Sequence, residues 1–492
     1  MTTSTASPDG LQRRLTSRQL TMIGIGGAIG TGLFLGSSLA ISQAGPAVVL
    51  AYILCGLVAL VIAWALAEMV VVHPTAGAFG TIAHHYLGAG TGFVLRWTYW
   101  AMQVIAIGGE VIAAGVYVQY WWPQITLWIP VTVFAAFVLI VNAAAVSFFG
   151  EFEYWFAMIK VTAIVIFVLL GVVMIVFGLP DHPATGTHLL TSHGGFLPHG
   201  LRGLMLAMVF VLFSYIGTEV VSVTAAESED PVRDIPRAAR AMILRLALFY
   251  VAAILIVVII VPWTVTAQGG AIEASPFVKV FASAGIPAAA TVMNFVVLTA
   301  ALSSANTNLY LTTRMLHSLS AHRLAPGWVG RLSSSGVPRN ALVLSGLGLV
   351  LAAIFSKNSN SNAYLMLFGV SVFAALVVWI LILATHTAFR VKRRQRGLPD
   401  SPVRLWGAPV TSGIVALFLA SVLVSTAWVE GLDPAWKFGL PFFVILIVIY
   451  VVMKRTGHCD HLMASTLADY NPDSAEIDSP PVALKALELE EE

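Results

Sequence analysis

Long apolar runs separated by short polar segments make up almost the whole chain. A membrane-spanning helix needs about 20 mostly apolar residues, and this length divides the chain into twelve candidate spans. They lie at about 20–41, 47–71, 94–119, 128–147, 154–178, 203–226, 242–262, 287–311, 341–356, 364–388, 408–428 and 436–453. Because a backbone in lipid must satisfy its own hydrogen bonds, the pattern predicts an all-α polytopic membrane protein with twelve transmembrane helices.

The composition excludes several other classes of protein. Only 10% of the 492 residues are charged and 58% are hydrophobic, whereas a soluble domain carries about 25% charged residues. Soluble enzymes and nucleic-acid binders are therefore excluded, and a net charge of +2 gives no reason to expect a polyanionic partner. The apolar runs are continuous rather than alternating, which excludes a membrane β-barrel. We expect the lipid bilayer as the surroundings and no nucleic-acid partner.

Positive charge is distributed unevenly between the two sides of the predicted membrane. Twenty-one of the 26 Lys and Arg residues lie on the same side as the N-terminus and four on the other side, while Lys160 lies within a span. The positive-inside rule then predicts a multi-pass protein of the cytoplasmic membrane with both termini in the cytoplasm. Residues 1–19 form the predicted N-terminal segment, 20–455 the twelve-helix domain, and 456–492 an acidic tail that we expect to be disordered.

Two spans carry signals for a broken helix. The first contains GIGGAIGTG, at residues 24–32, and the sixth contains the polar run Phe213–Glu219. A glycine in a helix interior costs about 0.8–1 kcal/mol relative to alanine. An unwound stretch exposes amides that favour an anion and carbonyls that favour a cation, so it suits a zwitterion. A dinucleotide site is rejected because no strand precedes the glycines; a glycine-lined packing seam stays an alternative.

The broken spans occupy matching positions in two five-helix halves. These halves cover about 20–178 and 203–388, and helices 11 and 12 follow at about 408–453. Such a pattern is typical of inverted repeats with a binding site between them near the middle of the membrane. The inference rests on position alone, since the two halves show no visible sequence identity.

Five segments carry a resemblance to a known family. They read RQLTMIGIGGAIGTGLFLGSSLAISQAGPA, PTAGAFGTIA, EFEYWFAMIKV, FSYIGTEVVSVTAAESEDPVRDIPRA and NFVVLTAALSSANTNLYLTTRML. From about residue 18 to 455 the chain resembles the amino acid–polyamine–organocation superfamily, and most of all its bacterial amino acid permeases. The resemblance implies a LeuT-like 5+5 core with helices 1 and 6 broken, and alternating-access transport of an amino acid without a cofactor.

The resemblance also implies which residues bind the substrate. The amides of Thr31 and Gly32 are expected to hold the carboxylate, and the carbonyls of Ala28, Phe213 and Ile216 the amine. Gly30 and Ser214 lie beside them, and Phe213 is a candidate gate. In span 8, Ser303, Ser304 and Asn306 are expected to line the pathway; hydrogen bonding between helices is the alternative for these small polar groups.

Charged residues within spans are functional candidates, because each costs at least about 2.5–3.5 kcal/mol at the bilayer centre. Glu219, just past the break in span 6, is expected to carry a proton or contact the substrate's amine; the alternative is a carboxylate that pairs two helices. Glu110 is placed near the substrate by the resemblance, either selecting a cationic side chain or supporting Glu219. Glu68 is expected to pair with an inner-loop arginine rather than to move a proton.

Lys160 bears on the coupling ion. In sodium-coupled relatives of this fold a cation joins spans 1, 5 and 8, and the resemblance implies that an ammonium replaces it in proton-coupled members. Glu110, Lys160 and Glu219 are therefore the proton-coupling candidates. The alternative for Lys160 is a lysine that snorkels to the inner interface. His84 and His85 fall in the predicted inner loop between spans 2 and 3, where we expect them to be solvated.

The sequence thus predicts a secondary active amino acid permease, coupled to protons. An exchanger would share every motif, and a sodium-coupled symporter is a weaker alternative. A membrane enzyme would require a pattern such as His-Glu-x-x-His or Gly-x-Ser-x-Gly, which the chain lacks. A channel would require a pore ring rather than two broken helices. No residue is assigned to a metal, and the particular amino acid and the oligomeric state stay open.

Overall fold

The computed structural model is helical throughout the part of the chain that it describes, and no strand occurs there. The described residues are 29–73, 78–143, 146–178, 183–219, 246–268, 275–283, 285, 287–333, 336–358, 362–429 and 431–456. The predicted N-terminal segment 1–19 and all but the first residue of the predicted tail 456–492 lie outside them.

Between residues 29 and 219, the described part of the chain contains eight α-helices and two short 3₁₀ turns. They are α2 (Thr31–Phe34), α3 (Gly36–Ala44), η1 (Gly45–Ala47), α4 (Val48–Val72), α5 (Ala78–Leu87), α6 (Ala89–Gln119), α7 (Trp128–Ala143), α8 (Val146–Val176), η2 (His188–Leu190) and α9 (Gly200–Ser214).

The second half begins with a π-helical segment, η4. Its described elements are η4 (Leu246–Ala252), α12 (Ala253–Ile260), α13 (Trp263–Gln268), α14 (Pro276–Ser283), α15 (Pro287–Ala321), α16 (Arg339–Ser345), α17 (Leu347–Asn358), α18 (Asn362–Gln395), α19 (Val410–Ser425), η5 (Thr426–Trp428) and α20 (Asp433–Arg455).

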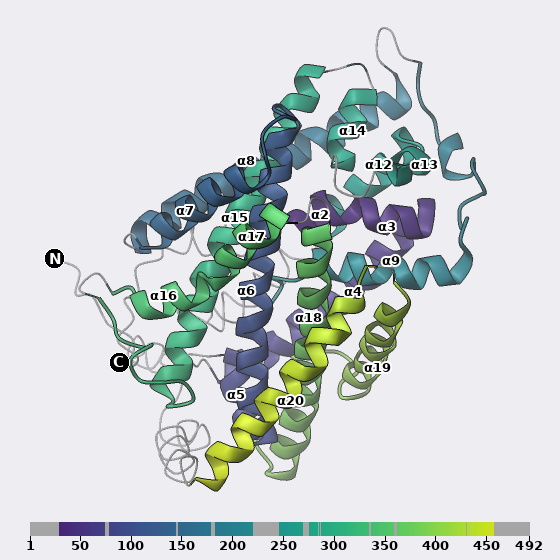
Figure 1. The fold of residues 1–492 in the computed structure, drawn as a ribbon. Coiled ribbons are helices and arrows are strands. Elements are labelled where there is room, and N and C mark those ends of the chain that lie inside the picture. The colour runs from purple at the N-terminus through teal and green to yellow at the C-terminus, as the bar shows by residue number, and fades with distance from the viewer. Residues whose placement is uncertain are drawn as a thin grey trace, which may run out of the picture.

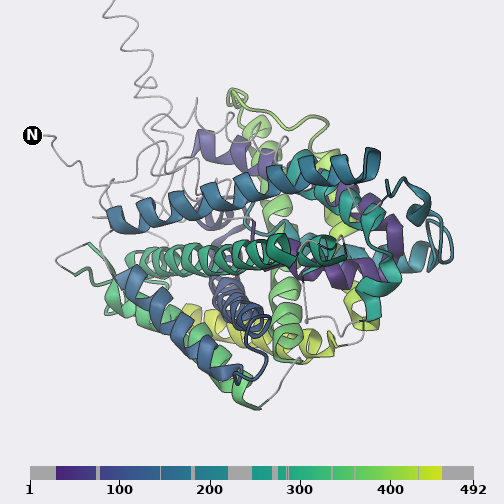
Figure 2. The same cartoon turned by 90° about the horizontal axis from the view of Figure 1, so that it is seen from above.

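Helix α6 lies at the centre of the bundle and packs against α15, α18, α17 and α5 (Figure 1). The view from above shows α8 and α15 lying alongside each other on one side of it (Figure 2). Glycines allow the closest approach between helices: a Cβ atom on Gly348 of α17 would lie 1.8 Å from the carbonyl oxygen of Val104 on α6. Small residues that bring backbones together are typical of helix pairs in membranes.

The apolar helices have the length and composition of membrane spans. Within the described residues, eight helical stretches are long and apolar enough to cross a bilayer, and α7, α9 and residues 249–260 are shorter apolar helices. Large apolar side chains are exposed along one face of α20, at Leu440, Val444, Ile447 and Val451. Lipid covers such a face in a polytopic membrane protein. The count of twelve spans and the inverted symmetry of 20–178 and 203–388 stay predictions.

Both predicted helix breaks coincide with helix ends in the described structure. Helix α2 begins only at Thr31, after non-helical Ile29 and Gly30. Helix α9 ends at Ser214, and residues 215–219 form turns that include Gly217 with a φ of +98°. The other side of each break, residues 24–28 and 220–226, lies outside the described residues. Helices α3 and α9 pack together and run across the direction of α6 in Figure 1.

Candidate functional site

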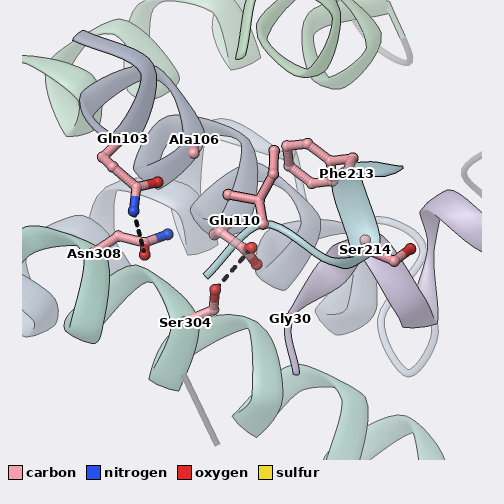
Figure 3. Close-up of a pocket in the computed structure, with 10 residues that line it drawn as sticks. Gly30, Gln103, Ala106, Glu110, Phe213, Ser214, Ser304 and Asn308 are labelled. Atoms are coloured by element: carbon pink, nitrogen blue, oxygen red, sulfur yellow. Dashed lines mark hydrogen bonds between the residues drawn. The ribbon is translucent and has the colours of Figure 1, made fainter. Parts of the chain in front are cut away.

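A pocket lies between the start of α2, the end of α9, and the facing sides of α6 and α15 (Figure 3). Its lining residues are Gly30, Gly32, Gln103, Ala106, Glu110, Phe213, Ser214, Ile216, Ser304 and Asn308. The α6 residues among them are spaced three and four apart and so share one face of the helix. Five of the predicted substrate-binding residues, together with Glu110 and Ser304, therefore come together around one space.

Gly30 and Gly32 are glycines because neighbouring atoms leave no room for a side chain. A Cβ atom on Gly30 would lie 2.7 Å from Glu110 Oε1 and 2.7 Å from Ser304 Oγ. One on Gly32 would lie 2.8 Å from the Cα atom of Ser214. The close approach of α2 to α6, α15 and the end of α9 thus depends on both glycines.

Glu110 is held by the start of α2 and by α15. Its Oε2 accepts a hydrogen bond from the backbone amide of Thr31 at 3.2 Å, and its Oε1 accepts one from Ser304 Oγ at 2.9 Å. The side chain is buried. The amide of Thr31 was expected to bind the substrate's carboxylate, and in this conformation a carboxylate of the protein itself occupies it.

The end of α9 is fixed by turn hydrogen bonds and by α4. The amide of Ile216 donates to the carbonyl of Phe213 at 3.1 Å, so this carbonyl is already paired. The Tyr215 hydroxyl donates to the carbonyl of Tyr52 at 2.7 Å, and the Tyr52 hydroxyl lies 3.2 Å from Ser214 Oγ. These contacts anchor the break against the neighbouring helix.

Phe213 packs against span 10 as well as lining the pocket. Its ring centroid lies 4.3 Å from that of Phe368 on α18. An aromatic ring at this place can cover a bound molecule, which is the geometry that a gate requires.

Glu219 is buried but is not among the residues that line the pocket. Its Oε2 accepts a hydrogen bond from the amide of Gly217 at 3.1 Å, within the turn that follows α9. Glu219 thus bonds within the turn that follows α9, while Glu110 is the carboxylate that faces the pocket. Ala28, the remaining predicted substrate-binding residue, lies outside the described residues.

Lys160 of α8 lies at a second polar centre. Its neighbours there are Ile29, which precedes α2, and Ser303 of α15. Its Nζ donates to the carbonyl of Ile29 at 3.2 Å and to Ser303 Oγ at 2.8 Å. The side chain is fully buried, so the snorkelling alternative is wrong for this conformation. Spans 1, 5 and 8 each contribute to this centre.

Glu153 joins this centre and was not among the predicted residues. It is fully buried, its Oε1 lies 4.0 Å from Lys160 Nζ, and the same oxygen accepts a hydrogen bond from Ser303 Oγ. Asn306, one helical turn further along α15, accepts a hydrogen bond from Asn142 of α7 at 2.7 Å. Ser303 therefore belongs to the Lys160 centre, whereas Asn306 joins α15 to α7, and neither lines the pocket.

The sequence did contain a signal for Glu153. Glu153 and Lys160 are seven residues apart in EFEYWFAMIK, which is two helical turns and one face of a helix. The span predicted at about 154–178 excludes Glu153 by one residue, whereas helix α8 begins at Val146 and includes it. A span that begins at 154 leaves Glu153 outside the membrane, so the predicted spans do not indicate it as an intramembrane charge.

Glu68 forms the ion pair that was expected of it. Its Oε2 accepts hydrogen bonds from Arg390 Nη2 at 2.8 Å, from the amide of Leu405 at 2.8 Å and from His386 Nε2 at 3.1 Å. Arg390 lies on the end of α18, not in a loop. The cluster ties α4 to α18 and to the segment before α19, which indicates a structural role.

The expectation of solvated histidines in the loop between spans 2 and 3 is wrong. His84 and His85 lie on α5, which packs against α6, and both are partly buried. Burial, together with the nearby Arg96 guanidinium, lowers the pKa of His84 to about 4. Arg96 itself is fully buried within α6. His84 is consequently neutral at physiological pH.

Comparison with known proteins shows the family to which the chain belongs. The family model described as amino acid permease matches residues 19–467. The gamma-aminobutyric acid permease of Bacillus subtilis is 35% identical over 467 residues, which cover 95% of this chain and 99% of that protein. The aromatic amino acid transport protein of Escherichia coli K12 is 36% identical over 449 residues, 91% of this chain and 96% of its own length. The chain belongs to the amino acid permease family.

Proposed function

We propose that the chain imports an amino acid across the cytoplasmic membrane by alternating access and that protons enter with it. In this proposal twelve spans, with both termini in the cytoplasm, form two inverted halves around the pocket of Figure 3. The proposal is supported by family membership and, above all, by the contact between Glu110 and the amide of Thr31.

That contact suggests how a proton and a substrate are linked. A substrate carboxylate that binds the amide of Thr31 lies beside the carboxylate of Glu110. Two carboxylates that share one hydrogen-bond donor cannot both stay ionised. Glu110 must therefore leave the amide or hold a proton when the substrate binds. Uptake of the proton from outside and its loss inside would make transport depend on the proton gradient.

The Lys160 centre supports protons rather than sodium as the coupling ion. The Lys160 ammonium contacts the carbonyl of Ile29 and the hydroxyl of Ser303, both oxygen ligands of the kind that a metal cation prefers. A sodium ion at the same place would have to displace a buried positive charge. Glu219, in the turn that follows α9, is the second carboxylate in the proposed proton path.

The proposal is tested by uptake into proteoliposomes that contain the purified full chain. Vesicles without internal amino acid should accumulate substrate under an inward proton gradient, in sodium-free buffer, and an uncoupler should abolish this accumulation. An exchanger would take up label only into vesicles preloaded with amino acid. Uptake that requires sodium would support the weaker alternative, and the absence of uptake for all twenty amino acids and γ-aminobutyrate would contradict the proposed function.

A further inference from the structure

One end of the pocket carries two amide side chains. Figure 3 shows Gly30 and Ser214 at one end, Glu110 and Ser304 in the middle, and Gln103 and Asn308 at the other. The first end holds the helix breaks, where the common parts of an amino acid are proposed to bind. The end with Gln103 and Asn308 is therefore left for the substrate's own side chain.

Gln103 has an unused acceptor inside the protein. Its side chain is 0% exposed, and its Nε2 donates to Asn308 Oδ1 at 3.4 Å and to the Tyr99 hydroxyl at 3.3 Å. Its Oε1 has no hydrogen-bond partner among the residues that the structure describes. In Figure 3 this oxygen and the amide nitrogen of Asn308 both point toward the interior of the pocket.

The pair thus presents one acceptor and one donor, and neither is charged. Two primary amides that share a single N–H···O bond leave one carbonyl oxygen and one NH₂ group available, whichever amide donates. A buried polar atom without a partner is unfavourable, so a ligand that satisfies both groups binds better than one that does not. An aliphatic or aromatic side chain would leave both groups unpaired.

A positively charged side chain does not fit this end either. Lysine-like ammonium groups have donors only, which would leave the Asn308 amide nitrogen facing another donor. Glu110 lies in the middle of the pocket, where it contacts Thr31 and Ser304. Neither Gln103 nor Asn308 at this end brings a negative charge to pair with an ammonium. Ala106 leaves space between Gln103 and Glu110 on α6, and Phe213 and Ile216 supply an apolar wall for a short methylene stem.

We propose that Gln103 and Asn308 select a neutral amino acid whose side chain both donates and accepts hydrogen bonds, a carboxamide or a hydroxyl. The inference rests on the proposed function and adds the substrate class to it. Family membership does not decide the class, since relatives at nearly the same identity are named for γ-aminobutyric acid, for aromatic amino acids and for threonine and serine.

The first test uses the unmodified protein in proteoliposomes and compares substrates of matched shape. Threonine is nearly isosteric with valine, and glutamine with methionine. We expect kcat/KM for threonine over valine, or for glutamine over methionine, to exceed about tenfold, because a site that pairs a polar group discriminates strongly against its apolar analogue. The preferred pair identifies hydroxyl or carboxamide. Uptake that favours the apolar partner in both pairs, or that favours lysine or phenylalanine, overturns the proposal.

The second test changes the pair itself. Gln103→Met keeps the length of the side chain and removes its amide, and should reduce the preference for the polar substrate to about threefold or less while uptake of the apolar analogue persists. Gln119→Met is the matched control, since Gln119 is the last residue of α6, does not line the pocket and donates to the carbonyl of Ile125; it should keep the wild-type ratio. An unchanged ratio in Gln103→Met overturns the inference but leaves amino acid transport standing.

Discussion

Gly32→Ala is expected to lower substrate uptake about five- to 150-fold, although it adds only one methyl group. The new Cβ atom would lie 2.8 Å from the Cα atom of Ser214 and 2.9 Å from Phe213 Cδ1. Because the first of these is a backbone atom, α2 and the end of α9 must separate. Overpacking of this kind costs about 1–3 kcal/mol, or about five- to 150-fold in affinity. Initial rates in proteoliposomes, normalised to folded protein, measure the loss.

Gly36→Ala is the matched control for this change. It introduces the same methyl group four residues later, but its Cβ atom would lie 3.5 Å from Phe368, an ordinary contact. Both substitutions improve helix propensity by about the same amount. Uptake by Gly36→Ala should stay within about twofold of wild type, because no atom has to move. Equal rates for the two variants would show that the approach of α2 to α9 does not form the site.

Neutralising one member of the Lys160–Glu153 pair is expected to cost more stability than neutralising both. Either single change, Lys160→Met or Glu153→Gln, leaves a buried charge without its partner, which costs about 3–5 kcal/mol. The double variant removes both charges and should recover much of this loss. Thermal unfolding in detergent measures the stability, and all three variants should lose accumulation driven by a proton gradient.

Glu151→Gln provides the control for Glu153→Gln. Glu151 lies on the same helix, is exposed and accepts a hydrogen bond from Trp155. Its neutralisation should change neither the unfolding temperature nor accumulation by much, because exposed charges contribute little to stability. Normal accumulation by Lys160→Met at every pH would assign proton coupling to other residues. A double variant less stable than both single variants would mean that the two charges do not act as a pair.

The sequence predicted the helix breaks because their signals are local. Glycine at 30 and 32 and the polar run after Phe213 act through backbone preferences, and the described α2 and α9 begin and end there. The ends of the long helices were less accurate. Helix α15 extends to Ala321 and α18 to Gln395, which is ten and seven residues beyond the predicted spans. The apolar run ends where the chain leaves the bilayer, whereas the helical hydrogen bonds continue past that point.

The partners of the buried polar groups could not be predicted in the same way. A helix that is apolar on all sides has no periodic stripe to show which face meets which neighbour. The sequence therefore indicated Ser303, Ser304 and Asn306 of span 8 but gave no reason to join Asn308 of the same span to Gln103. Likewise, the burial of Arg96 and His84 results from the packing of α5 on α6, which a polar loop sequence does not reveal.

Proton movement during transport is the most direct test of the central claim. Proteoliposomes with a pH-sensitive dye trapped inside, in sodium-free buffer and without an imposed gradient, receive the preferred amino acid from outside. The account predicts that the lumen acidifies as substrate enters, that D-mannitol at equal concentration gives no signal, and that Glu110→Gln, which cannot release a proton, abolishes the signal. Net uptake of substrate with no change in luminal pH would contradict it.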